Sequence, residues 1–134
     1  MTVSTPTTAI RYPKSTVIRA ERAMRCAPFH LHLFITMKEQ SVALIAIAQA
    51  AGVEHRYTVK PLSELRAESE LLWLIQVGLL RREVDGQGLT DSFRLTPLGR
   101  QLTDRWQTYP HAQYPANWRD RLYNTLVRWW HFSF

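Results

Sequence analysis

The stretch GLLRREVDGQGLTDSFRLTPLGRQL, residues 78–102, carries the clearest structural signal in the chain. Residues 79–84 are strand-like, and in the returning strand Phe93 and Leu95 alternate with Arg94. Between the strands, the sequence Asp-Gly-Gln-Gly supplies glycines for the positive φ angles of a tight hairpin turn. Pro97 suits the first turn of a helix that continues to about residue 106. This stretch therefore predicts a β-hairpin followed by a helix.

The segment before the hairpin predicts an amphipathic helix at about residues 61–77, which Gly78 ends. Apolar residues recur at helical spacing on one face, so we expect that face to point into the core, with Leu71 and Leu74 beside it. The residues of the face are Leu62, Leu65, Leu72, Ile75 and Leu79. Residues 53–61, VEHRYTVKP, look like an insertion in the turn of a helix-turn-helix.

Three further helices are predicted towards the N-terminus. Ser15 is a candidate N-cap of the first, and Pro28 breaks it and starts the second over residues 28–40. The third covers residues 41–52 and is expected to end at Gly52 as a C′ glycine. The side chains expected to point inward are Val17, Ala20, Met24, Ala27, Phe29, Leu33, Phe34, Met37, Leu44, Ile47, Ala48 and Ala51.

The hairpin stretch resembles the wing of bacterial winged-helix regulators of the MarR and PadR types. The matching motifs are Gly78-Leu79-Leu80, Arg81-Arg82-Glu83, Asp85-Gly86 and Phe93-Arg94-Leu95-Thr96-Pro97-Leu98-Gly99. The resemblance covers about residues 28–106. It implies a mainly α fold with a small β-hairpin, that is, a winged helix-turn-helix with extra N- and C-terminal helices. The whole chain also resembles a small uncharacterised protein family of cyanobacteria, which brings no function with it.

The length of 134 residues predicts one domain. Residues 1–14 predict a flexible arm, and residues 15–134 a single winged-helix domain with its core at 28–106. One cysteine, Cys26, excludes an intramolecular disulfide and suits a reducing compartment. The first residues lack the apolar region of a signal peptide, and the longest uncharged run, residues 40–53, is too short to span a bilayer. We therefore expect a cytoplasmic protein.

The basic balance of the chain favours a polyanionic partner. Lys and Arg number 17 against 11 Asp and Glu, which gives a net charge of +6. The candidate nucleic-acid contacts are Arg56, Lys60, Ser63, Arg66, Arg81, Arg82 and Arg94. Against DNA, the helix at 61–77 carries Glu64, Glu68 and Glu70 where a recognition helix would meet phosphates. The alternative for these glutamates is helix-dipole matching, and for each basic residue it is a solvated surface position.

Two functions of different classes remain open. The first is a winged-helix DNA-binding protein, a candidate transcriptional regulator that binds double-stranded DNA as a dimer. The net charge and the wing arginines favour it. The second is a non-enzymatic protein-protein interaction module within a larger assembly, which the acidic helix and the inserted turn favour. Fold alone does not decide between them.

The C-terminal segment, residues 107–134, predicts a loop and then an aromatic helix. Its polar residues share about 100° of arc, so the wide aromatic side needs a partner. The candidate interface residues on that side are Trp118, Leu122, Leu126, Trp129 and Trp130. The partner is the protein's own core, a second copy or other protein, or, least favoured, a membrane interface.

Residue patterns for catalysis or metal binding are missing from the sequence. His30 and His32 are two apart, which on a helix is about 200° of rotation, so they do not share one metal ion. Cys26 and His30 flank a proline break without a third ligand at zinc-like spacing. No glycine-rich phosphate loop or serine nucleophile elbow is present. We expect no enzyme activity, no metal site and no cofactor.

Overall fold

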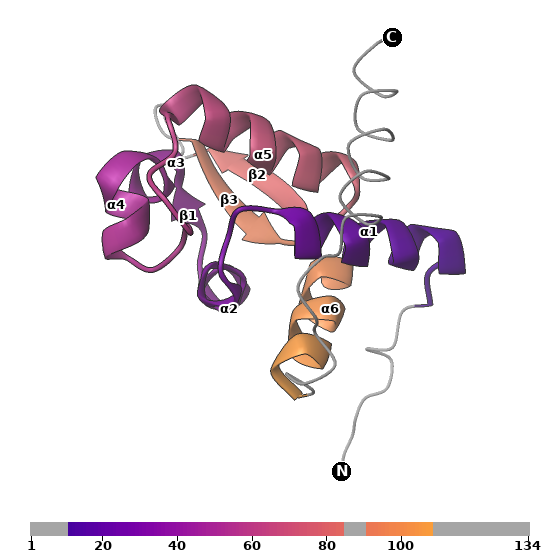
Figure 1. Cartoon of the computed structure of the whole chain (residues 1–134). Coiled ribbons are helices and arrows are strands. Elements are labelled where there is room, and N and C mark those ends of the chain that lie inside the picture. Colours follow the sequence, from indigo (N-terminus) through magenta and orange to yellow (C-terminus); the bar gives the residue numbers. More distant parts are fainter. Residues whose placement is uncertain (1–10, 85–90, 109–134) are drawn as a thin grey trace, which may run out of the picture.

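The computed structural model describes residues 11–84 and 91–108. The elements are α1 (Lys14–Cys26), α2 (Leu31–Glu39), β1 (Val42–Ala43), α3 (Leu44–Ile47), α4 (Gln49–Glu54), α5 (Glu64–Gln76), β2 (Leu80–Val84), β3 (Asp91–Leu95) and α6 (Pro97–Thr108) (Figure 1). Some predictions fall outside the described residues: most of the arm, the hairpin tip, and the C-terminal loop and helix. The interface candidates among them are Trp118, Leu122, Leu126, Trp129 and Trp130.

The strands form one antiparallel sheet in the order β1-β3-β2. The hairpin pairs from Leu80 opposite Leu95 to Val84 opposite Asp91. The short strand β1, which the sequence does not predict, joins β3 with Val42 opposite Phe93. A helix, a strand, two short helices, a long helix and a hairpin follow one another, and the first strand pairs with the last (Figure 1). The predicted mainly α fold with a small β-hairpin is confirmed.

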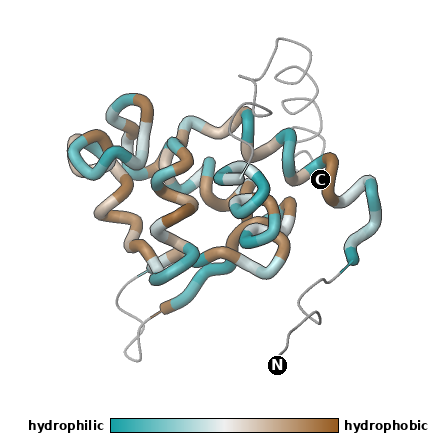
Figure 2. The backbone as a smooth tube through the Cα atoms, turned by 90° about the horizontal axis from the view of Figure 1, so that it is seen from below, coloured by the Kyte–Doolittle hydropathy of each residue, from teal (hydrophilic) through white to brown (hydrophobic). Residues whose placement is uncertain are grey.

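The hydrophobic core lies where the helices meet the sheet. Its largest fully buried side chains include Trp73 of α5, Phe34 of α2 and Phe93 of β3. Figure 2 shows hydrophobic and hydrophilic residues alternating along the helices, as expected when each helix buries one stripe. Each such side chain stabilises the fold by about 1.5–3 kcal/mol when buried. The core thus fixes the hairpin against α2 and α5.

The predicted inward face of α5 is only partly right. The predicted Leu62, Leu71, Leu74 and Leu79 are buried, as is Trp73. Leu65 is 77% exposed and Leu72 is 36% exposed, so for these two the prediction is wrong. The helix contains more leucines than one face can bury, and the face with the large Trp73 and the small Ala67 is the one that packs inward. Leu65 and Leu72 lie one heptad apart, so they share the outer face.

Two predicted helix starts are also wrong. Helix α1 begins at Lys14, after Pro13 at the N-cap position, and Ser15 lies inside the helix. Helix α2 begins at Leu31 rather than at Pro28. The reason is tertiary, because Phe29 forms an isolated antiparallel bridge with Thr58 that holds this segment extended.

The predicted third helix is broken at Ala48 into α3 and α4. Gln49 takes a φ of 60°, and its N–H donates to the carbonyl oxygen of Leu62 at 2.6 Å. Gly52 is not a C′ residue but lies within α4, where a Cβ would stand 2.0 Å from the carbonyl oxygen of Ile47. Gly52 is therefore needed for close packing rather than for ending the helix.

Helices of the described residues are all too short or too polar to cross a bilayer.

Candidate interaction surface of the wing and helix α5

Two of the residues predicted to contact DNA, Ser63 and Arg66, instead form hydrogen bonds within the N-terminal part of α5. Ser63 is the N-cap, and its Oγ accepts a hydrogen bond from the N–H of Arg66 at 3.0 Å. The Nε of Arg66 donates to Oε2 of Glu70, one turn along the helix, also at 3.0 Å. Glu70 is buried, with 8% of its surface exposed. Ser63 and Arg66 thus stabilise the helix that carries them.

The hairpin of β2 and β3 is called the wing below, and Arg82 connects it to α5 through an ion pair. Its Nη2 lies 3.5 Å from Oε2 of Glu68 on α5, and its Nε lies 3.7 Å from Oδ1 of Asp91 on β3. The guanidinium also stands 5.6 Å from the ring centroid of Phe93, which is opposite Arg82 in the sheet. Both ion pairs are half-exposed, so each is worth only about 0–1 kcal/mol. Their larger effect is on charge, because Arg82 is neutralised within the molecule.

Arg81 and Arg94 lie opposite each other in the sheet, on the face away from Arg82. Arg81 pairs with Glu83 at 2.9 Å, and Nη2 of Arg94 donates to the backbone carbonyl oxygen of Glu39 at 3.2 Å. The three wing arginines therefore do not all lie on one face, since Arg82 is on the opposite side of the sheet. Each of the three is engaged with a neighbouring carboxylate or carbonyl group.

Arg56 and Lys60 are the exception. Both are exposed, and neither has an ion-pair partner within residues 11–84 and 91–108. The loop that carries them is fixed on the start of α2, because the N–H of His30 donates to Tyr57 O at 2.9 Å. Arg56 lines a hollow with residues of α2 and α4, and no residue of α5 takes part in that lining.

The outer face of α5 carries a feature that the sequence prediction missed. Leu65, Glu68, Ser69 and Leu72 line a shallow hollow of about 160 Å³. The available signal was the excess of leucines over what one helical face can bury, together with Trp73 on the other side. This face is apolar and acidic.

Residues 10–128 match the family model described as Npun_F0494-like. The chain belongs to the Npun_F0494-like family. All the described elements, from α1 to α6, lie within the match. No curated protein and no solved structure matches the chain. The matching model is not that of the MarR or PadR regulators, so the resemblance of the wing to those proteins stays a prediction.

In this Npun_F0494-like chain the wing and α5 together carry a net charge of −2. Residues 61–96 contain four basic residues and six acidic residues. A surface that binds duplex DNA needs a local excess of positive charge, because release of counterions from the phosphates drives the binding. The net charge of +6 is therefore located in other parts of the chain.

Proposed function

We propose that this chain is a non-enzymatic winged-helix module that binds a partner protein through the outer face of α5. The observation that carries the proposal is the hollow between Leu65 and Leu72, which are 77% and 36% exposed. A single exposed leucine is ordinary on a protein surface, but two that line one hollow form an apolar patch. An apolar side chain of a partner protein would fill it.

The charges around the hollow favour a protein over a duplex. Glu64 is exposed next to Leu65, and it has no ion pair within the described residues. Arg66 and Arg82 are held by Glu70 and Glu68, so they do not offset Glu64. A partner that presents an apolar side chain beside Lys or Arg complements this face, whereas phosphates would be repelled by it.

A cytoplasmic location is part of the proposal. Cys26 is the one cysteine of the sequence and is partly buried, and a chain without an intramolecular disulfide is compatible with a reducing compartment. Dimerisation through the C-terminal segment is not needed for the proposed contact, because α5 lies in the winged core.

Site-specific photo-crosslinking in cells tests the proposal. A photoreactive phenylalanine analogue replaces Leu65 in one variant and Ile45 in a matched control, since these side chains are 77% and 74% exposed. We expect a discrete crosslinked protein from position 65 and none from position 45. Adding Leu72→Lys should remove that product while circular dichroism stays unchanged. Equal crosslinking from both positions, or a product at position 65 that contains only nucleic acid, would contradict the proposal.

Binding of double-stranded DNA, as in a transcriptional regulator, is the second candidate. The unpaired Arg56 and Lys60 favour it. Two phosphate contacts give a logarithmic salt slope of about −1.8, which corresponds to weak, sequence-independent binding.

A further inference from the structure

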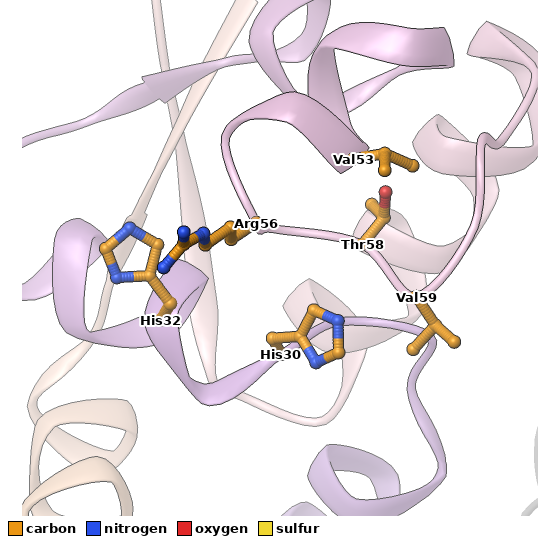
Figure 3. A pocket seen from close by; sticks show the side chains of 6 residues that line it. All are labelled: His30, His32, Val53, Arg56, Thr58 and Val59. Carbon is orange, nitrogen blue, oxygen red and sulfur yellow. The ribbon is translucent and has the colours of Figure 1, made fainter.

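A hollow of about 380 Å³ opens between the loop after α4 and the start of α2. Its lining consists of His30, His32, Val53, Arg56, Thr58 and Val59 (Figure 3). The two walls are tied together by backbone hydrogen bonds, from His30 N–H to Tyr57 O at 2.9 Å and from Val59 N–H to Pro28 O at 3.2 Å. The ring of His32 also stacks on Tyr57, with 5.6 Å between centroids. The hollow is therefore a built feature of the fold.

Arg56 enters this hollow from a backbone position that usually belongs to glycine. It has a φ of 63° and follows the C-cap of α4, with its N–H donating to Val53 O and the next N–H donating to Gly52 O. After α5 the equivalent position is filled by Gly78, with a φ of 90°. Any residue with a Cβ strains the backbone at this φ, whereas glycine does not. The arginine therefore costs stability here, and the group it provides in return is the guanidinium. Figure 3 shows it extending toward His32.

The start of α2 adds further hydrogen-bond donors. The first turn contains no acidic residue, and the N–H groups of Leu31 and His32 have no acceptor within the described part of the chain. Free N–H groups at a helix N-terminus carry partial positive charge. His30, at the N-cap, places its ring on the same lining.

Thr58 also belongs to this lining. Its side chain is only 2% exposed, and its Oγ1 is buried without a hydrogen-bond partner. In Figure 3 the hydroxyl points toward Val53, another residue of the lining. The hydroxyl is packed close to Gly52, where an added Cβ would stand 2.7 Å from Oγ1.

We propose that this hollow binds a small phosphate monoester. The phosphate lies between the Arg56 guanidinium and the first turn of α2, because a planar fork of donors and free helix N–H groups both suit a multiply charged oxyanion. The organic group of the ester packs against the apolar side chains of Val53 and Val59, which are 41% and 63% exposed without it. This inference shares no residue with the proposed protein-binding face of α5, so either can fail alone.

Titration of the full chain followed by amide NMR tests the proposal, with phenyl phosphate, inorganic phosphate and phenol as probes. We expect saturable shifts at the amides of Leu31, His32 and Tyr57. Phenyl phosphate should bind about tenfold more tightly than inorganic phosphate because its ring meets the valines, and phenol should not bind measurably. Shifts that do not saturate, or phenol that binds as well as phenyl phosphate, would overturn the proposal.

Two variants separate a built site from diffuse charge attraction. Arg56→Gly keeps the backbone conformation and should weaken phenyl phosphate at least about tenfold, as expected for loss of a charge-assisted contact. Lys60→Gln removes the same charge from outside the lining and should weaken binding less than about twofold, since exposed charges are screened. If Arg56→Gly binds as tightly as the wild type, or if Lys60→Gln loses as much, the site is not the one proposed.

Discussion

The wing with α5 and the loop of residues 55–60 both carry basic side chains, but they differ in what those side chains meet. In the first region Arg66, Arg81 and Arg82 lie 3.0, 2.9 and 3.5 Å from carboxylate oxygens. In the second region Arg56 and Lys60 have no such partner among the described residues. A net charge of +6 therefore does not say where a polyanion binds. Whether each basic side chain is already paired with a carboxylate is a better guide to where a polyanion binds.

The difference follows from the local sequence and from topology. Residues 55–62 contain no Asp or Glu, so the loop cannot neutralise itself. The wing pairs instead across elements, because the sheet brings Arg82 to Glu68 of α5 and to Asp91 of β3.

The largest effect is expected from Gly52→Ala, which acts beneath the loop. A Cβ there would stand 2.0 Å from Ile47 O and 2.7 Å from Thr58 Oγ1, and the backbone oxygen cannot move aside cheaply. The free energy of unfolding in urea should fall by about 3 kcal/mol. Ala50→Ser, at an exposed position of the same helix, should change it by less than about 0.5 kcal/mol. A loss below about 1 kcal/mol for Gly52→Ala would contradict the packing described for the loop.

Unpairing the wing is expected to have the next largest effect. The double variant Glu68→Gln with Glu83→Gln leaves Arg82 and Arg81 with fewer carboxylate partners, so affinity for random duplex DNA at low salt should rise about tenfold. Fluorescence anisotropy of labelled duplex DNA measures this affinity.

The control for that variant is Glu39→Gln with Glu54→Gln, which makes the same change in net charge at exposed side chains elsewhere. If both double variants gain equally, total charge rather than pairing governs the affinity.

Much of the fold follows from local sequence signals. The hairpin is predictable because turn glycines and alternation are local, and Gly78 takes the positive φ expected of a residue that ends a helix. The break between α3 and α4 cannot be predicted locally, because it depends on a hydrogen bond from Gln49 N–H to Leu62 O across the inserted loop. The same holds for the start of α2, which depends on the bridge between Phe29 and Thr58.

Less of the candidate site could be predicted. Residue type identifies Arg82 as basic, but only the fold shows that Glu68 and Asp91 neutralise it. Leucine spacing alone does not say which face of α5 turns inward, so the exposure of Leu65 comes from the packing of Trp73. The sequence identifies the charged side chains, but the tertiary structure determines which of them form ion pairs.

Retention on a heparin column gives a smaller but direct comparison of the two regions. Arg56→Gln with Lys60→Gln should elute at lower salt than Arg81→Gln with Arg82→Gln, although both double variants lose two positive charges. Unpaired cations contribute more to polyanion binding than cations already neutralised within the protein. The reverse elution order would show that the ion pairs of Arg81 and Arg82 break readily on binding to heparin. The proposed difference between the wing and the loop of residues 55–60 would then be wrong.

The smallest effect concerns the strained backbone of the loop. Arg56→Gly should raise the free energy of unfolding by up to about 1 kcal/mol, because glycine adopts a φ of 63° without steric cost. Lys60→Gly, at an exposed loop position without a positive φ, should lower it by a few tenths of a kcal/mol at most. Urea unfolding of both variants checks this, and a clear loss of stability for Arg56→Gly would mean that the arginine side chain holds the loop.

Binding of fluorescein-labelled random duplex DNA across a salt series tests most directly whether the wing and α5 form a DNA-reading surface. We predict no binding in the low-micromolar range at about 50 mM salt, and the same result for Arg81→Glu with Arg82→Glu, because those arginines are already paired. Low-micromolar binding that weakens steeply with salt, and that this double variant abolishes, would contradict the account and restore the wing as a DNA contact.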